Sequence, residues 1–144
     1  MKVKIKKLHE DALIPTYAHE TDAGMDFYTL EDESVESLTT KIIRTGIAMD
    51  IPDGHSLELY PRSGLSGNHP NYLSNSVGIV DSHYIGEVLV LFRNNSFNQT
   101  LNIPKHTKIM QGVLRKFYKA EFEEVEEFKD SERGTDGFGS TGDS

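Results

Sequence analysis

The sequence has 144 residues, no cysteine and a formal net charge of −8, from 15 Lys and Arg against 23 Asp and Glu. This length suits one domain with a single core, and the absence of thiols excludes disulfides and cysteine-based metal or catalytic sites. The acidic charge and the absence of a long apolar run argue against nucleic-acid and membrane partners, so we expect a cytoplasmic protein.

Short apolar stretches separated by turn residues recur along most of the chain. The first, Met1–Lys6, alternates apolar and basic residues, which indicates an opening strand rather than a secretory signal. The others are Met25–Leu30, Ile42–Ile43, Ile47–Ile51, Leu57–Tyr60, Val77–Val80, Val88–Phe92 and Ile109–Leu114. Many short strands at this spacing predict an all-β sandwich, barrel or jelly roll.

A β-hairpin is predicted around Gly78–Val88. The apolar runs on either side enclose Asp81-Ser82-His83, which has the chemistry of a turn. The tip of this hairpin presents Asp81 and Tyr84. Taken alone, an aspartate at a turn most often hydrogen-bonds its own backbone, so the hairpin by itself does not identify a site.

The C-terminal part of the chain changes character twice. In Tyr118–Lys129, apolar residues recur every third position among glutamates, a spacing that fits either a helix or an irregular strand. From Asp130 onward Gly, Ser and Thr dominate, which predicts a disordered terminus, although an Arg and a Phe among glycines could also cradle phosphate. We therefore divide the chain into a β domain, residues 1–129, and a flexible glycine-rich arm, residues 130–144.

Five stretches need one explanation. They are Ala23-Gly24-Met25-Asp26, Pro61-Arg62-Ser63-Gly64-Leu65-Ser66, Asn75 to Glu87, Lys108-Ile109-Met110-Gln111, and Arg133 to Gly142. In this order and at these intervals they resemble the five motifs of the homotrimeric dUTPase family, over nearly the whole chain. The resemblance implies a jelly-roll-like β-barrel and a homotrimer whose three sites are each built from all three chains. It also implies that Tyr118–Phe128 is a strand.

The resemblance further implies hydrolysis of dUTP at the α-phosphorus to dUMP and pyrophosphate, which limits uracil in DNA and supplies dUMP for dTMP synthesis. Phosphoryl transfer depends mainly on positioning and charge neutralisation. Asp81 would accept a proton from the attacking water, and Asp26 would orient groups near that water or near the metal's water shell. The implied cofactor is Mg²⁺, held by the substrate phosphates and water without direct protein ligands.

By the same resemblance, Tyr84 would lie against the deoxyribose and exclude a 2′-hydroxyl. Asn75 would read the uracil edge with its amide, together with the backbone of Ile79, Val80 and Asp81. The simpler alternatives are a core or interface tyrosine and an ordinary turn asparagine.

The remaining motif residues are assigned to the phosphates and to the arm. The phosphates would be bound by Arg62, Ser63, Gly64 and Gln111. Once substrate is present, Phe138 would cover the uracil, and the triphosphate would be engaged by Arg133, Gly139, Ser140 and Thr141. A surface arginine and a solvent-facing glutamine are the simpler alternatives.

Three residues depart from the family pattern. His83 and Asp136 stand where other types are common, and Lys108 replaces a frequent arginine. His83, next to the hairpin aspartate, could add a pH dependence near neutrality, and Asp136 could weaken closure of the arm. Two other functions remain open: a dCTP deaminase of the same fold, which ammonia release would reveal, and a regulatory binding protein switched by nucleotide.

Overall fold

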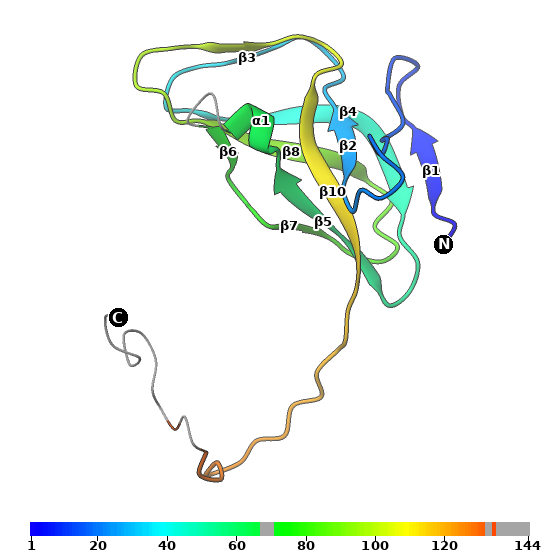
Figure 1. Cartoon of the computed structure of the whole chain (residues 1–144), viewed down its shortest axis with the longest axis vertical. Coiled ribbons are helices and arrows are strands. Elements are labelled where there is room, and N and C mark those ends of the chain that lie inside the picture. The colour runs from blue at the N-terminus through cyan, green and yellow to red at the C-terminus, as the bar shows by residue number, and fades with distance from the viewer. Residues whose placement is uncertain (67–70, 132–133, 135–144) are drawn as a thin grey trace.

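The structure, a computed structural model, describes residues 1–66, 71–131 and 134. Within these residues the chain forms ten strands and one four-residue helix (Figure 1). They are β1 (Lys4–Lys7), β2 (Met25–Tyr28), β3 (Glu33–Val35), β4 (Thr40–Asp50), β5 (His55–Pro61), α1 (Ser63–Ser66), β6 (Asn71–Leu73), β7 (Gly78–Val80), β8 (Glu87–Asn94), β9 (Leu101–Ile103) and β10 (Lys108–Lys116). The predicted all-β class is confirmed. No helix in this part of the chain is long and apolar enough to cross a membrane.

Two four-stranded antiparallel sheets make up the body of the molecule. One has the strand order β1-β4-β8-β6 and the other β2-β10-β5-β7, while β3 and β9 form a separate pair. Neighbouring strands in each sheet are mostly distant in sequence, so each sheet is tied together by long connections. This arrangement is the jelly-roll-like β fold expected from the sequence.

A single apolar core joins the two sheets. Phe27 of β2, Leu57 of β5 and Met110 of β10 come from one sheet, and Ile43 of β4 and Phe92 of β8 come from the other. All five belong to one cluster and are at most 1% exposed. Truncating either phenylalanine to alanine would therefore cost about 3–5 kcal/mol of folding free energy.

Strand β8 shows how the sequence produces this layer. Its residues alternate between buried and partly exposed positions over the whole strand. Val88, Val90 and Phe92 point into the core and are each 1% exposed. Because successive side chains in a strand point to opposite faces, this alternation fixes which face of the sheet meets the core.

The chain leaves the sheets at the end of β10. Residues 117–131 contain neither helix nor strand, and Figure 1 shows them running away from the body of the molecule. The strand predicted for Tyr118–Phe128 is therefore wrong for this single chain, and so is the helical alternative. Phe122 and Phe128 are 94% and 92% exposed, so neither ring is packed against the described residues and nothing there offsets the entropy cost of ordering this segment.

Candidate active site

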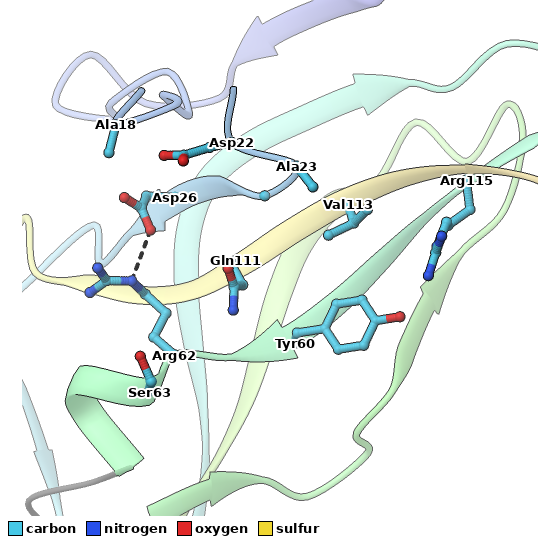
Figure 2. Close-up of a pocket in the computed structure, with 11 residues that line it drawn as sticks. Ala18, Asp22, Ala23, Asp26, Tyr60, Arg62, Ser63, Gln111, Val113 and Arg115 are labelled. Atoms are coloured by element: carbon cyan, nitrogen blue, oxygen red, sulfur yellow. Dashed lines mark ion pairs between the residues drawn. The ribbon is translucent and has the colours of Figure 1, made fainter. Parts of the chain in front are cut away.

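A cavity of about 610 Å³ lies on the β2-β10-β5 part of one sheet (Figure 2). Gln111 of β10 pairs with Asp26 of β2 on one side and with Tyr60 of β5 on the other. Residues paired across antiparallel strands point to the same face, so this register gathers side chains that are far apart in sequence. The cavity, called here the sheet cavity, contains the predicted residues Asp26, Arg62, Ser63 and Gln111.

Asp26 is the electrostatic centre of the sheet cavity. Its Oδ1 lies 2.8 Å from Arg62 Nε and its Oδ2 lies 2.7 Å from Lys108 Nζ, although its side chain is only 10% exposed. The hydrogen bond to Asp26, reinforced by its negative charge, raises the pKa of the Lys108 ammonium above its ordinary value. One carboxylate between two cations leaves a net positive charge, which favours an anionic ligand.

Arg62 and Gln111 are held by backbone carbonyls as well. Arg62 Nη1 donates to the carbonyl of Lys108 at 3.2 Å, and Gln111 Nε2 donates to the carbonyl of Pro61 at 3.1 Å. A guanidinium has five N–H donors, so among the described contacts Arg62 retains donors for a ligand. A Cβ placed on Gly24 would lie 2.7 Å from Gln111 Oε1, which shows that the glycine makes room for the glutamine.

The far end of the sheet cavity carries a second group of polar side chains. Figure 2 shows Tyr60 and Arg115 at the end opposite the Asp26–Arg62 pair. The Tyr60 hydroxyl donates to Glu58, and Arg115 Nε lies 3.2 Å from Glu58 Oε2. The Tyr60 hydrogen bond and the Arg115 charge lower the pKa of the Glu58 carboxyl. Sequence reasoning missed this group, because its members lie outside the motif stretches.

Ser63 and Gly64 begin the short α1 helix that follows Arg62. Ser63 is exposed and lines the sheet cavity. A Cβ added to Gly64 would meet no described atom within 4 Å apart from its chain neighbours and the backbone of its own helix. A ligand could therefore approach this backbone closely. In the described part of the chain, no group of three or more His, Cys, Asp or Glu residues is arranged to hold a metal ion.

The β-hairpin predicted around Gly78–Val88 is wrong, because β7 pairs with β5 in one sheet and β8 pairs with β4 and β6 in the other, so this segment connects the two sheets. A second cavity, of about 350 Å³, lies beside β7 and β8 and is called here the hairpin cavity, after the segment in which the hairpin was predicted. It brings together the predicted residues Asn75, Ile79, Val80, Asp81 and Tyr84. Asp81 is exposed, and among the described residues no donor contacts its carboxylate. The alternative in which Asp81 serves only to hydrogen-bond its own turn therefore has no support in this geometry.

The Tyr84 side chain lies against Gly86 and Glu87, in the connection from β7 to β8 and at the start of β8. Its hydroxyl lies 3.4 Å from the carbonyl of Glu87, and a Cβ on Gly86 would overlap the ring and the hydroxyl of Tyr84. Gly86 is thus the residue that allows this position of the ring. The tyrosine remains 47% exposed and lines the hairpin cavity, so a ligand there can reach it.

The turn between β7 and β8 is fastened to residues 50–55, which run from the end of β4 to the start of β5. Ser82 Oγ donates to the carbonyl of His55 at 2.7 Å, and the His83 amide donates to the carbonyl of Ile51 at 3.0 Å. The His83 ring lies between two carboxylates, with Nδ1 2.9 Å from Asp50 Oδ1 and Nε2 3.1 Å from Asp53 Oδ1. The sequence singled out His83, but its two partners 30 and 33 residues away could not be identified without the fold.

The two cavities are separate in one chain. They share no lining residue. Tyr60 lines the sheet cavity and Leu59 lines the hairpin cavity, and successive side chains of β5 point to opposite faces of the sheet. A single chain therefore holds Arg62 and Asp81 in different places.

The predicted arm residues cannot be placed in the same way. Arg133, Phe138, Gly139, Ser140 and Thr141 lie outside the described residues, as does Asp136. Their roles stay predictions. The same holds for the proposed division between the β domain and the arm.

Comparison with known proteins gives a consistent result. The sequence model of the dUTPase family matches residues 10–142. The chain is 42% identical over 140 residues to the deoxyuridine 5′-triphosphate nucleotidohydrolase of Clostridioides difficile, covering 97% of both chains. Among solved structures, it resembles the dUTPase of Staphylococcus bacteriophage 80alpha with dUPNHPP, with a TM-score of 0.90, 28% identity and 98% of both chains covered.

A further similar solved structure is described with a metal ion. It is a variant of the dUTPase from phage phi11 of S. aureus, described with a structural Mg(II) ion. The TM-score is 0.84 at 25% identity, and the match covers 90% of this chain and all of the other.

Proposed function

The chain belongs to the dUTPase family, and we propose that it hydrolyses dUTP to dUMP and pyrophosphate with its own Asp81 as the base. The observation that carries this proposal is the convergence of Asn75, Asp81 and Tyr84 on one cavity. As a dUTP diphosphatase, the protein limits uracil incorporation into DNA and supplies dUMP for dTMP synthesis. We place this activity in the cytoplasm, where it would meet the nucleotide precursors of DNA.

Asp81 is suited to activate water. Its carboxylate is exposed in the hairpin cavity and engaged by no donor of the described residues, so it can accept a hydrogen bond from a water molecule. Water attacks the α-phosphorus, its proton passes to Asp81, and the bond between the α-phosphorus and the bridging oxygen breaks. Pyrophosphate then leaves with the electron pair of that bond.

Base and sugar recognition belongs to the same cavity. The amide of Asn75 offers a donor and an acceptor, as does the edge of uracil, and the backbone of Ile79, Val80 and Asp81 would supply the remaining hydrogen bonds. Tyr84, which is exposed in this cavity, would pack against the deoxyribose and leave no space for a 2′-hydroxyl.

The sheet cavity would bind the triphosphate. Arg62 and Lys108 provide positive charge, and Gln111 and Ser63 provide neutral donors. Gly64 would admit the phosphates close to the backbone. Asp26 would act by positioning Arg62, because its carboxylate contacts that side chain directly. In the arm, Phe138 would close over the uracil, and Arg133, Gly139, Ser140 and Thr141 would complete the phosphate contacts.

The residues present fit a Mg²⁺ ion that is held mainly by the substrate. Both oxygens of Asp26 already form ion pairs, so this carboxylate would reach such an ion through water rather than directly. When bound, the ion supplies neutralisation of the phosphate charge.

We also propose that the protein acts as a homotrimer with sites shared between chains. Arg62 and Asp81 line different cavities of one chain, so a triphosphate bound in the sheet cavity would meet the hairpin cavity of another copy. Ile79 of β7 and Ile85, in the connection from β7 to β8, are 67% and 72% exposed in the single chain. A neighbouring copy would cover such apolar side chains.

A panel of nucleotides tests the function. Pyrophosphate release would be measured with each of the eight common ribo- and deoxynucleoside triphosphates, with and without Mg²⁺, and ammonia release would be measured with dCTP. We expect pyrophosphate from dUTP alone, dependent on Mg²⁺, and no ammonia. Ammonia from dCTP would instead identify a deaminase, and binding of dUTP without turnover would identify a regulatory protein.

A further inference from the structure

The turn that carries Asp81 and Tyr84 is attached to a part of the chain that contributes nothing else to the hairpin cavity. Strand β4 ends at Asp50 and β5 begins at His55, and the connection between them receives every long-range hydrogen bond described for Ser82 and His83. Two of these bonds go to backbone carbonyls and two involve the His83 ring. The position of the turn therefore depends on residues 50–55.

The backbone of His83 is unusual. Its φ is 60°, in the left-handed region, which is uncommon for residues other than glycine but is adopted more often by asparagine, aspartate and histidine than by other types. Histidine and asparagine therefore both suit this backbone, and they differ here in the ring. The ring is also the part that contacts both carboxylates.

Protonation of the ring decides how many of these contacts can form. A neutral imidazole has one N–H, whereas the imidazolium has two. Because Nδ1 and Nε2 face Asp50 Oδ1 and Asp53 Oδ1, only the imidazolium can donate to both. The neutral form would keep one hydrogen bond and leave its other nitrogen lone pair facing a carboxylate.

Other charged groups surround this contact. Lys4 Nζ of β1 lies 3.5 Å from Asp50 Oδ2 and competes for that carboxylate, and the His55 ring contacts the carbonyl of Asp53. Tyr118 and Lys119, at the start of the segment after β10, line a cavity of about 550 Å³ together with His83. The positive charges of Lys4 and Lys119 oppose protonation of His83, and the two aspartates favour it.

We propose that His83 is a positioning residue for the hydrolysis of dUTP: its ring bridges Asp50 and Asp53 and so holds the turn that presents Asp81 and Tyr84. Asp81 precedes His83 by two positions and Tyr84 follows it directly, so a shift of the ring moves both. This inference rests on the proposed role of Asp81 as the base. A displacement of about 1 Å in such a group can lower the rate about 100-fold.

The charge state of this bridge depends on pH in a defined direction. The hydrogen bond to Asp50, with a further contribution from Asp53, raises the pKa of the His83 imidazole. The bridge is therefore complete below the unfolded-state pKa of about 6.5 and is lost as the pH rises through the raised pKa. The hydrogen bond to His83 lowers the pKa of the Asp50 carboxyl, so on the acid side the bridge is lost only as the pH falls through that lowered value.

The test compares His83→Asn with the wild-type enzyme. Asparagine tolerates the left-handed backbone but cannot carry the charge, so the substitution removes the bridge without straining the turn. His9→Asn is the matched control. His9 is also an exposed histidine near an aspartate, Asp11, but it lies far in sequence from residues 78–88. For each protein, kcat and KM for dUTP would be measured from about pH 6 to about pH 9, on either side of an ordinary imidazole pKa.

At the acid end we expect His83→Asn to have a kcat about 3- to 10-fold below wild type, with KM changed less than about twofold. The two proteins should converge as the pH passes the imidazole pKa of His83, measured separately by NMR. Amide hydrogen exchange in residues 78–88 should be faster in the variant at the acid end only. His9→Asn should match wild type throughout.

Two results would overturn the proposal. One is a wild-type kcat for His83→Asn at the acid end, and the other is a loss of kcat that does not change with pH. Failure of the proposed base is distinguishable, because it would show as retained turnover in Asp81→Asn. Retained turnover in Asp81→Asn would not change the expected difference in amide exchange of residues 78–88 between His83→Asn and wild type.

Discussion

The sheet cavity and the hairpin cavity differ in what holds their side chains in place. In the sheet cavity, Asp26 and Gln111 are aligned by strand pairing, and the aspartate is nearly buried between two cations. In the hairpin cavity, Asp81 and Tyr84 are exposed and depend on a few hydrogen bonds from one turn. Under the proposed roles, the groups that bind charge are thus held by strand pairing and ion pairs, and the reacting group by the hydrogen bonds of one turn.

The largest expected effect is that of Asp81→Asn, which should separate turnover of dUTP from binding of dUTP. Asp81→Asn should lower turnover of dUTP by about 100- to 10,000-fold, because the amide cannot accept the proton from water. Affinity for a non-hydrolysable dUTP analogue, measured by calorimetry, should change less than about threefold, since the sheet cavity is intact. Turnover within tenfold of wild type would falsify the assignment.

The Arg62→Ala variant tests whether the sheet cavity binds the phosphates. Arg62→Ala removes one of the two cations around Asp26 and should raise KM for dUTP by about 30- to 100-fold, as expected for the loss of a charged hydrogen bond to phosphate. It should also lower the melting temperature, because a nearly buried carboxylate loses a partner. Arg62→Lys is the control and should fall in between. Equal KM values for all three proteins would exclude Arg62 from phosphate binding.

The Tyr84→Ala variant tests whether the exposed turn between β7 and β8 selects deoxyribose over ribose. Tyr84→Ala should reduce the preference for dUTP over UTP by about tenfold, by opening space for the 2′-hydroxyl. The measurement is the ratio of kcat/KM for the two nucleotides. Discrimination against dTTP should stay unchanged, because it depends on the base. If the variant still refuses UTP, sugar selection resides elsewhere.

Gly24 should give the smallest effect. Gly24→Ala would bring a Cβ within 2.7 Å of Gln111 Oε1, at the far end of a flexible side chain that can rotate away. We expect KM for dUTP to rise only about two- to threefold and kcat to be unchanged. A large loss of kcat would mean that Gln111 has little freedom and that the sheet cavity is stiffer than this geometry indicates.

Much of the fold and the site could be predicted from the sequence because the signals were local. Apolar stretches between turn residues located the main strands. The turn at Asp81-Ser82-His83 was also located, but the β-hairpin expected around it is wrong, because β7 and β8 belong to different sheets and the pairing of distant strands decides this. The motif stretches also assigned Arg62, Ser63 and Gln111 to one ligand group, the phosphates, and the structure places all three in the sheet cavity. Their roles in catalysis and binding stay predictions.

The failures concern interactions that no local pattern encodes. The segment 117–131 was expected to be regular because Phe122, Val125 and Phe128 recur every third residue, but such a pattern becomes stable only when its apolar side chains pack, and here Phe122 and Phe128 remain exposed. In the same way, the contacts of His83 with Asp50 and Asp53 depend on how a long-range turn is placed. The pairing of Lys108 with Asp26 required the strand register.

The separation of the two cavities has a genetic consequence. A mutation that inactivates the sheet cavity and one that inactivates the hairpin cavity damage different halves of each site. In a shared-site trimer, Arg62→Ala and Asp81→Asn chains expressed together would form some sites with an intact Arg62 from one copy and an intact Asp81 from another. Two impaired alleles of one gene would then complement each other, and a cell carrying both would hydrolyse dUTP faster than a cell carrying either allele alone.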